Sequence, residues 1–190
     1  MKEGTTLNLT LFDARPEESS VTPAENRCYD LLDTLGISFQ RVDHEAADTI
    51  EICHPIEKTL GCNICKNLFL ANRQQTVFYL LLLPGDKPFK TKYLSAQIQS
   101  SRLSFGSPEN MERLMDLKPG SVSVFGLMND KENKISLLID RDLEKEEYIG
   151  FHPCKNTSTL KVKYHDITTK FLPAVNHEPA YVELPWTFDD

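Results

Sequence analysis

The stretch CNICKNLFLANRQQTVFYLLLLPG, residues 62–85, decides the fold because it holds two apolar segments joined by a short polar turn. Residues 64–70 predict a strand, residues 72–75 predict a tight turn, and residues 77–83 form a nearly continuous apolar run. A run without alternation predicts a strand that is buried on both faces. We therefore predict a strand pair inside the core, with Lys66 and Asn67 at the mouth of its first strand.

Helices and strands alternate on both sides of this strand pair. Thr22 and Pro23 supply a capping residue and a first-turn proline, so they predict an amphipathic helix that Gly36 ends. The other predicted elements are a strand over 37–42, helical turns over 49–60 interrupted at Pro55, helices over 92–99 and 107–115, strands over 135–139, 148–151 and 157–162, and a final helix over 165–172. Because the order lacks a regular βαβ rhythm, we expect an α+β fold with a mixed sheet flanked by helices, not a doubly wound parallel sheet.

The length of 190 residues suits one domain, and the 40% hydrophobic content suits a globular core. We expect residues 1–21 to be an N-terminal extension, because they hold few apolar side chains. No apolar run approaches the ~20 residues that cross a bilayer, so we expect no membrane association. The N-terminus lacks the pattern of a secretory signal, and five cysteines, an odd number, do not suit a secreted disulfide framework. The expected location is the cytoplasm.

The formal net charge of −7 disfavours indiscriminate binding to polyanions, because such binding relies on Lys and Arg that neutralise phosphates. A nucleic-acid ligand would need a local basic patch. The candidate patch is Lys87, Lys90 and Lys92, with Arg102 further on. The alternative is that these lysines belong to a solvated loop and the start of a helix.

Cys62 and Cys65 have the two-residue gap of a zinc knuckle or a redox pair. A structural zinc site needs a second pair, and the other cysteines, Cys28, Cys53 and Cys154, are scattered. Residues 62–65 also run into a predicted strand, whose alternate side chains point to opposite faces. We therefore favour buried or half-buried thiols and no metal, and keep a small zinc protein as an alternative that metal analysis can test.

Two polar clusters stand out against the apolar pattern. Lys66 and Asn67 interrupt a core strand, and an ammonium group buried without a partner is costly, so Lys66 should face solvent, an anion or a cleft. His152, Asn156 and Thr157 lie on a short loop between predicted strands. The residues alone leave ordinary alternatives open: an edge-strand lysine for the first cluster and loop hydrogen bonding for the second.

Taken together, the segments resemble the free-standing prolyl-tRNA editing proteins, relatives of the insertion editing domain of bacterial prolyl-tRNA synthetase and of the YbaK deacylases. The resemblance covers about residues 22–185, as an editing domain that leaves residues 186–190 as a C-terminal tail. Six blocks follow in the family's order: Lys66–Leu70, Leu82–Pro84, Ser101–Phe105 with Ser107–Glu109, Pro119–Val122, Phe125–Leu127 with Asn129–Asp130, and Gly150–Pro153 with Asn156–Thr157. The Phe-Gly-Leu and Phe-His-Pro blocks resemble the alanyl-tRNA(Pro) branch more than the cysteinyl branch.

The resemblance implies a mixed, partly closed sheet and a metal-free, cofactor-free hydrolysis of the ester that joins alanine to tRNA(Pro), with the tRNA acceptor end as partner. It assigns a catalytic role to Lys66 and His152. Predicted substrate-binding residues are Asn67, Gly120, Ser121, Val122, Asn156, Thr157 and Arg102. One position departs from the pattern: Val124 stands where the family's loop usually ends in proline, so the rigidity of that loop does not carry over.

An aminoacyl ester is already activated by its α-ammonium group, so positioning of water and stabilisation of the oxyanion can suffice. We interpret Lys66 as an anchor for the charged acceptor end; a general base is the alternative, and it would require a pKa depressed towards neutrality. The competing functional hypothesis is a non-catalytic regulator that binds aminoacyl-tRNA or a free amino acid in the same pocket.

Overall fold

The computed structural model describes residues 9–47 and 50–188 of the chain. Its helices are α1 (Pro23–Leu35), α2 (Ile50–Leu60), α3 (Thr91–Gln97), α4 (Pro108–Met115), α5 (Tyr164–Asp166) and α6 (Leu172–Ala174), with 3₁₀ turns η1 (Glu18–Ser20), η2 (Val124–Asn129) and η3 (Arg141–Lys145) and a π turn η4 (Ile167–Phe171). Its strands are β1 (Leu11–Phe12), β2 (Phe39–Asp43), β3 (Asn63–Asn72), β4 (Phe78–Pro84), β5 (Leu103–Phe105), β6 (Ile135–Asp140), β7 (Tyr148–Phe151), β8 (Ser158–Lys163) and β9 (Ala180–Val182).

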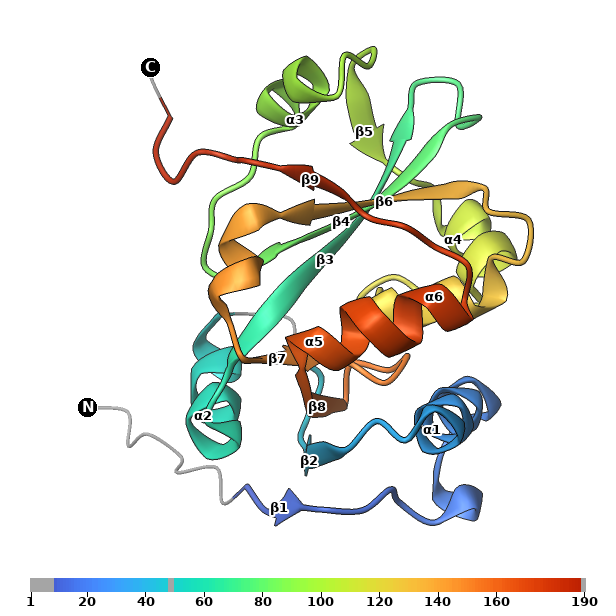
Figure 1. Ribbon diagram of the computed structural model, residues 1–190, viewed down its shortest axis with the longest axis vertical. Coiled ribbons are helices and arrows are strands. Elements are labelled where there is room, and N and C mark those ends of the chain that lie inside the picture. Colours follow the sequence, from blue (N-terminus) through green and yellow to red (C-terminus); the bar gives the residue numbers. More distant parts are fainter. Residues whose placement is uncertain (1–8, 48–49, 189–190) are drawn as a thin grey trace.

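The strands form one mixed sheet in the order β1-β2-β8-β7-β3-β4-β6-β9, with β5 also paired to β3 (Figure 1). The pairs β7–β3, β4–β6 and β6–β9 are parallel, and the other pairs are antiparallel. β3 joins the two halves, because Asn63 and Ile64 pair with β7 while the rest of the strand pairs with β4 and β5. The predicted mixed sheet with flanking helices is confirmed, but the described strands follow an open path, whereas the resemblance implied a partly closed sheet.

The predicted strand pair of residues 62–85 is confirmed as the antiparallel hairpin β3–β4. The Asn72 side chain closes its turn by accepting hydrogen bonds from the backbone N–H groups of Thr76 and Val77, at 2.8 and 3.1 Å. Leu80 to Leu83 are all buried, as the absence of alternation predicted. The hairpin therefore fixes Lys66 opposite Leu83, at the end of β3 that lies away from the turn.

The predicted ends of α1 are confirmed, whereas the predicted interruption of α2 is not. Thr22 and Glu25 form a reciprocal capping box, and Gly36 ends α1 in the left-handed conformation. α2 continues through Pro55, where we predicted an interruption. A proline removes one helical hydrogen bond, but the burial of Ile56 and Leu60 in the core holds the second half of the helix in place.

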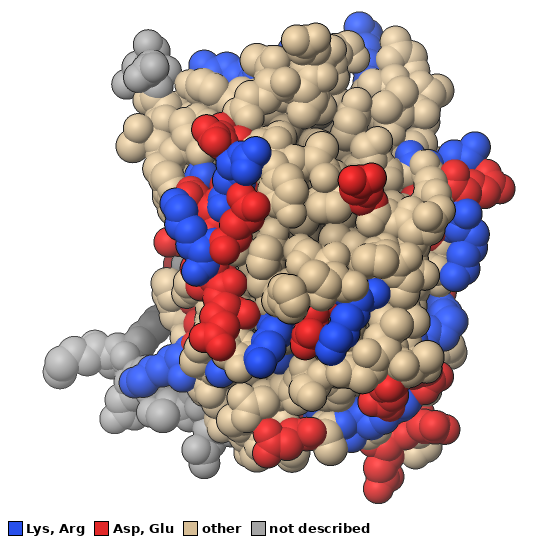
Figure 2. Space-filling view, in the orientation of Figure 1, with Lys and Arg blue, Asp and Glu red and all other residues tan. Residues whose placement is uncertain are grey.

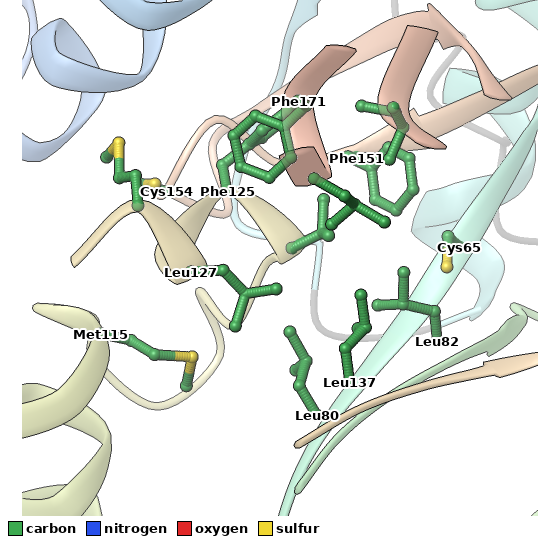
Figure 3. Close-up of a cluster of buried hydrophobic side chains, with 14 of the residues drawn as sticks. Cys65, Leu80, Leu82, Met115, Phe125, Leu127, Leu137, Phe151, Cys154 and Phe171 are labelled. Carbon is green, nitrogen blue, oxygen red and sulfur yellow. The ribbon is translucent and has the colours of Figure 1, made fainter. Parts of the chain in front are cut away.

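The helices cover the two faces of the β2–β8 part of the sheet. α1 packs Cys28, Tyr29 and Leu32 into the main hydrophobic core, whereas α2 packs Ile56 and Leu60 into a smaller cluster with Val42 and Ile64. In the main core the Phe125 ring meets the rings of Phe151 and Phe171 edge to face, at centroid distances of 5.8 and 5.2 Å (Figure 3). Full burial of such a ring is worth about 1.5–3 kcal/mol.

Acidic and basic side chains alternate on the face of the molecule drawn in Figure 2, and no broad field of one sign covers that face. None of the described helices combines the length and the apolar character needed to cross a membrane. The segment before α1 lies against the body: β1 pairs with β2, and Arg15 forms ion pairs with Asp30 and Asp33 of α1 at 2.7 and 3.1 Å.

Candidate functional site

A cavity of about 310 Å³ opens beside the Lys66 end of β3. α2, β3, the turn after β4, the loop before η2 and the loop after β7 all contribute to its wall. The lining residues are Ala47, Cys53, His54, Glu57, Ile64, Cys65, Lys66, Asn67, Gly85, Asp86, Gly120, Val122 and His152. The predicted residues Lys66, Asn67, Gly120, Val122 and His152 therefore meet at one cavity, although they lie far apart in the sequence.

Lys66 is half-buried, and its Nζ atom donates a hydrogen bond to the backbone carbonyl of Lys87 at 2.7 Å. Burial lowers the pKa of the Lys66 ammonium group, and the nearby charge of Asp86 works in the opposite direction. An ammonium group has three N–H donors. The contact with Lys87 uses one donor, so the others suit an anionic group in the cavity.

Asn67 connects β3 to the loop before η2. Its Oδ1 atom accepts the backbone N–H of Val124 at 3.0 Å, and its Nδ2 atom donates to the Cys65 carbonyl at 3.0 Å. Val124 is fully buried. A proline at position 124 has no N–H, so this chain holds the loop by a hydrogen bond that a proline at this position could not make.

The loop before η2 has fewer amide groups for a ligand than the sequence suggested. Gly120 takes a left-handed φ of 86°, and the buried Ser121 donates its backbone N–H to the Lys118 carbonyl at 3.0 Å. The Val124 amide is bound by Asn67. Within the described chain, no acceptor contacts the backbone N–H groups of Gly120, Val122 and Ser123, and these three are the candidates for binding an oxyanion.

His152 and His44 form a hydrogen-bonded pair that runs through Thr159. His152 Nδ1 lies 2.8 Å from the Ser158 carbonyl oxygen and 3.3 Å from Thr159 Oγ1. His44 Nε2 lies 2.8 Å from the same hydroxyl, and His44 Nδ1 lies 2.6 Å from the Glu45 carbonyl oxygen. A carbonyl accepts only, so both imidazoles carry their proton on Nδ1 when neutral. Burial lowers the pKa of His44, which favours this neutral form.

Asn156 and Thr157 lie behind the cavity wall. Their backbone carbonyls accept the N–H groups of Ala47 and His44 at 3.2 and 3.0 Å. These contacts hold the segment that presents Ala47 to the cavity. Both residues thus shape the cavity through the backbone of their neighbours, and neither side chain lines it.

The structure does not bring Arg102 to the cavity. Arg102 is exposed and directly precedes β5, which pairs with the Asn72 end of β3. Asn72 lies six residues beyond Lys66 on β3, a distance of roughly 20 Å at ~3.3 Å per residue. A role for Arg102 in substrate binding would require contact with a distant part of the ligand.

We predicted that Lys87 belongs to a basic surface patch or, alternatively, to a solvated loop. Both predictions are wrong for Lys87, because its side chain is buried. The Lys87 side chain is 1% exposed, and its Nζ atom forms ion pairs with Asp140 at 2.7 Å and Asp142 at 2.9 Å. A buried ammonium needs such partners. Lys90 and Lys92 lie instead over the rings of Phe188 and Tyr93.

Sequence reasoning missed the contribution of α2 and of Asp86 to the cavity. Glu57 Oε1 accepts the backbone N–H of Ile64 at 2.9 Å, and Glu57 Oε2 lies 3.3 Å from His54 Nδ1. Asp86 lies on the turn directly after Gly85. Two carboxylates therefore share the cavity with Lys66. The i,i+3 spacing of His54 and Glu57 on a predicted helix was the only signal in the sequence.

Cys62 and Cys65 do not face a common centre. Cys65 is buried in the main core, whereas Cys62 packs against the cluster under α2. Burial raises the pKa of the Cys62 thiol to about 12, and it raises that of Cys65 as well. In the described part of the chain, no three His, Cys, Asp or Glu side chains are grouped as a metal site requires. The arrangement does not suit a zinc knuckle.

Comparison with solved structures identifies the fold. A crystal structure of a protein proposed to be a trans-editing enzyme for prolyl tRNA synthetase is similar, with a TM-score of 0.64 at 15% identity, covering 87% of this chain and 99% of that one. A second solved structure, the hypothetical protein APE2540, gives a TM-score of 0.60 at 14% identity over 80% of this chain and 95% of that one. The chain therefore shares the fold of these two proteins.

Sequence comparison identifies the family. A family model for the aminoacyl-tRNA editing domain matches residues 44–170. The prolyl-tRNA editing protein ProX of Acetoanaerobium sticklandii is 31% identical over 136 residues, which cover 72% of this chain and 83% of that protein. The prolyl-tRNA synthetase associated domain-containing protein 1 of Danio rerio is 26% identical over 170 residues, 87% of this chain and 91% of that protein. The chain belongs to the aminoacyl-tRNA editing domain family.

Proposed function

We propose that this protein hydrolyses the aminoacyl ester of mischarged tRNA(Pro), with alanyl-tRNA(Pro) as its main substrate, by metal-free attack of water. The observation that carries the proposal is the convergence of Lys66, His152 and the Gly120 loop on one cavity. Membership of the editing family and the similarity to a prolyl-tRNA editing protein support the substrate class.

Opposite charges in the cavity match the two charges of the substrate end. Lys66 binds the anionic acceptor end, through a phosphate or beside the ester. The α-ammonium group of the amino acid is attracted to the carboxylates of Glu57 and Asp86, which line the same cavity. Ala47, Ile64 and Val122 supply the apolar part of the wall. A small apolar space that admits alanine and excludes proline would act as a second sieve for a synthetase that cannot strongly reject the smaller side chain.

In the reaction, the oxygen of water attacks the ester carbonyl carbon, and the bond from that carbon to the ribose oxygen breaks. Amides of the Gly120–Ser123 segment stabilise the oxyanion, while a ribose hydroxyl of the substrate assists removal of the proton from water. The departing ribose oxygen takes up a proton. In this proposal Lys66 acts as a cation throughout, since the Lys87 carbonyl and the nearby charge of Asp86 both favour the ammonium form. His152, held by Ser158 and Thr159, fixes one side of the cavity.

The test is deacylation of alanyl-tRNA(Pro) by wild type, Lys66→Ala and Lys66→Arg. We expect the alanine variant to lose most activity and the arginine variant to recover part of it, because anchoring needs a cation and general-base catalysis needs a neutral amine. Full activity of Lys66→Ala would remove the role assigned to Lys66. Activity that chelator treatment abolishes would contradict a metal-free reaction.

A panel of alanyl-, cysteinyl-, seryl- and prolyl-tRNA(Pro) tests the substrate. Alanyl-tRNA(Pro) should give the highest kcat/KM, and equal hydrolysis of prolyl-tRNA(Pro) would exclude the small-cavity sieve. Protein at substoichiometric concentration separates an enzyme from a regulator: an enzyme releases several equivalents of amino acid, and a binding protein releases none.

A further inference from the structure

The Lys87 side chain lies in a closed polar cluster that the proposed reaction does not use. Its Nζ atom contacts Asp140 and Asp142, and Asp140 is as fully buried as Lys87. The indole of Trp186 covers the Nζ atom at 5.1 Å from the ring centroid, and its Nε1–H group donates to Asp142 at 2.8 Å. The cluster thus joins four parts of the chain: the turn after β4 with Lys87, the end of β6 with Asp140, η3 with Asp142, and the C-terminal segment with Trp186.

The C-terminal segment reaches this cluster through its pairing with the sheet. β9 runs parallel to β6, with Val182 opposite Asp140 (Figure 1). Two residues further on, the backbone N–H of Leu184 donates to Asp140 Oδ2 at 3.3 Å. Val182, Leu184 and Trp186 lie beyond the 44–170 segment that the editing-domain family model matches.

Two carboxylates, Asp140 and Asp142, face the single Lys87 ammonium group, and the exposed Lys145 supplies a second cation at Asp142. The pKa of Asp142 is held well below its usual range, first by Lys145 and then by Lys87 and Trp186. Asp142 is therefore ionised near neutral pH and can pair with Lys87. Removal of one partner from a buried ion pair leaves the other charge uncompensated, so the cluster resists displacement of the Lys87 side chain.

The Lys87 backbone connects the cluster to Lys66. The carbonyl of Lys87 accepts the hydrogen bond from Lys66 Nζ at 2.7 Å. The backbone N–H of Lys87 donates to the carbonyl of Pro84 at 3.1 Å, which closes the turn. The same turn lies tight against β3, since a Cβ atom on Gly85 would lie 2.4 Å from the carbonyl oxygen of Ile64. The turn is thus fixed by its backbone on one side and by the Lys87 side chain on the other.

We propose that Lys87 is a positioning residue for Lys66, and that Trp186 and Leu184 complete its support by closing the ion cluster from the C-terminal segment. The inference rests on the proposed role of Lys66 in ester hydrolysis. Lys87 does not touch the cavity; it sets the place of the carbonyl that holds Lys66 Nζ. An error of 1 Å in such a position can cost about 10²-fold in rate.

Two mild variants test the proposal without removing a buried charge. Trp186→Phe keeps a ring over Lys87 and loses the bond to Asp142, and Asp142→Asn keeps the size of a side chain that is 24% exposed. We expect kcat on alanyl-tRNA(Pro) to fall about tenfold in each, with little change in KM, because a displaced Lys66 still binds the acceptor end but holds the ester out of line with the attacking water. The control is Lys145→Ala, which removes an exposed partner of Asp142 that does not contact Lys87 and should keep full activity.

A second measurement, independent of turnover, follows Lys66 itself. The Cε signals of ¹³C-labelled lysines are titrated by NMR, and the signal that Lys66→Arg lacks identifies Lys66. Release of the turn exposes the ammonium, so its pKa should rise in both variants towards the ordinary ~10.4. A fall in kcat with this shift supports the proposal.

Two results would overturn the positioning role of Lys87. One is full kcat in folded Trp186→Phe and Asp142→Asn, and the other is a lower kcat with an unchanged pKa of Lys66. Wild type that does not hydrolyse any charged tRNA would count against the proposed function instead. In that case the Lys66 titration alone still decides whether the cluster positions Lys66.

Discussion

The hydrogen bond from the Val124 N–H to Asn67 Oδ1 gives a prediction that can be worked through in numbers. Asn67→Ala removes the acceptor, and Val124→Pro removes the donor. The backbone accepts proline here, because Ser123 is extended (φ −149°, ψ 150°), as the residue before proline must be, and Val124 is the first residue of η2. The cost of Val124→Pro is therefore the lost bond and the lost packing, and not backbone strain.

The magnitudes follow from burial. Val124 is fully buried, so its N–H has no replacement partner in Asn67→Ala, and we expect a loss of about 1–3 kcal/mol in the free energy of unfolding. In Val124→Pro water can reach the half-buried Asn67, so the bond should cost about 0.5–1.5 kcal/mol, partly offset by about 0.4–1 kcal/mol from the stiffer unfolded chain. Because both changes remove the same bond, the double variant should be less destabilised than the sum by about 1 kcal/mol.

Urea unfolding of wild type, both single variants and the double variant measures this coupling, and Val124→Ala measures the packing loss with the N–H retained. A coupling energy within the ~0.3–0.5 kcal/mol scatter of independent sites would refute the reasoning. In that event the hydrogen bond to Asn67 would not be what holds this loop.

Two further predictions concern the turn after β4 and the histidine pair. Gly85→Ala should lower kcat about tenfold, because the added Cβ atom meets the Ile64 carbonyl and displaces the turn whose Lys87 carbonyl accepts the hydrogen bond from Lys66. The control is Gly36→Ala, whose Cβ atom meets nothing within 4 Å and which should keep full kcat in the same assay. Burial lowers the pKa of His44 below its unfolded value of ~6.5, so the unfolded state binds more protons and stability should fall as pH drops from ~6.5 through the folded pKa. In urea melts at about pH 7.5 and about pH 5.5, His44→Gln should lose less stability than wild type, and equal losses would contradict a buried neutral imidazole.

Local signals in the sequence predicted the local structure well. Thr22 and Gly36 mark the ends of α1 because caps depend on residues next to one another in the chain, and the apolar run of β4 indicates burial by itself. Strands β5 and β9 went unpredicted because three residues are too few to show a period. The mixed sheet followed from the order of elements, and the strand order within it did not.

The site was predictable only in part, for a physical reason. Lys66 and Asn67 stand out because polar groups in a core strand need partners, and the resemblance added a role for His152 and the whole of the Gly120 loop. Lys87 was misread because nothing near it in the sequence shows that Asp140 and Asp142 neutralise it from more than fifty residues away. Contacts of that range depend on sheet topology, which local pattern does not encode.

The closure of the Lys87 cluster by Trp186 has a practical consequence for handling the protein. A truncation ahead of Leu184, or an affinity tag that pulls this segment from the sheet, would remove a hydrogen bond from Asp140 and the indole from Asp142. Such a protein could pass every test of folding and still give a misleadingly low turnover. Preparations that are tagged at the N-terminus are therefore the ones whose kinetic constants should be compared.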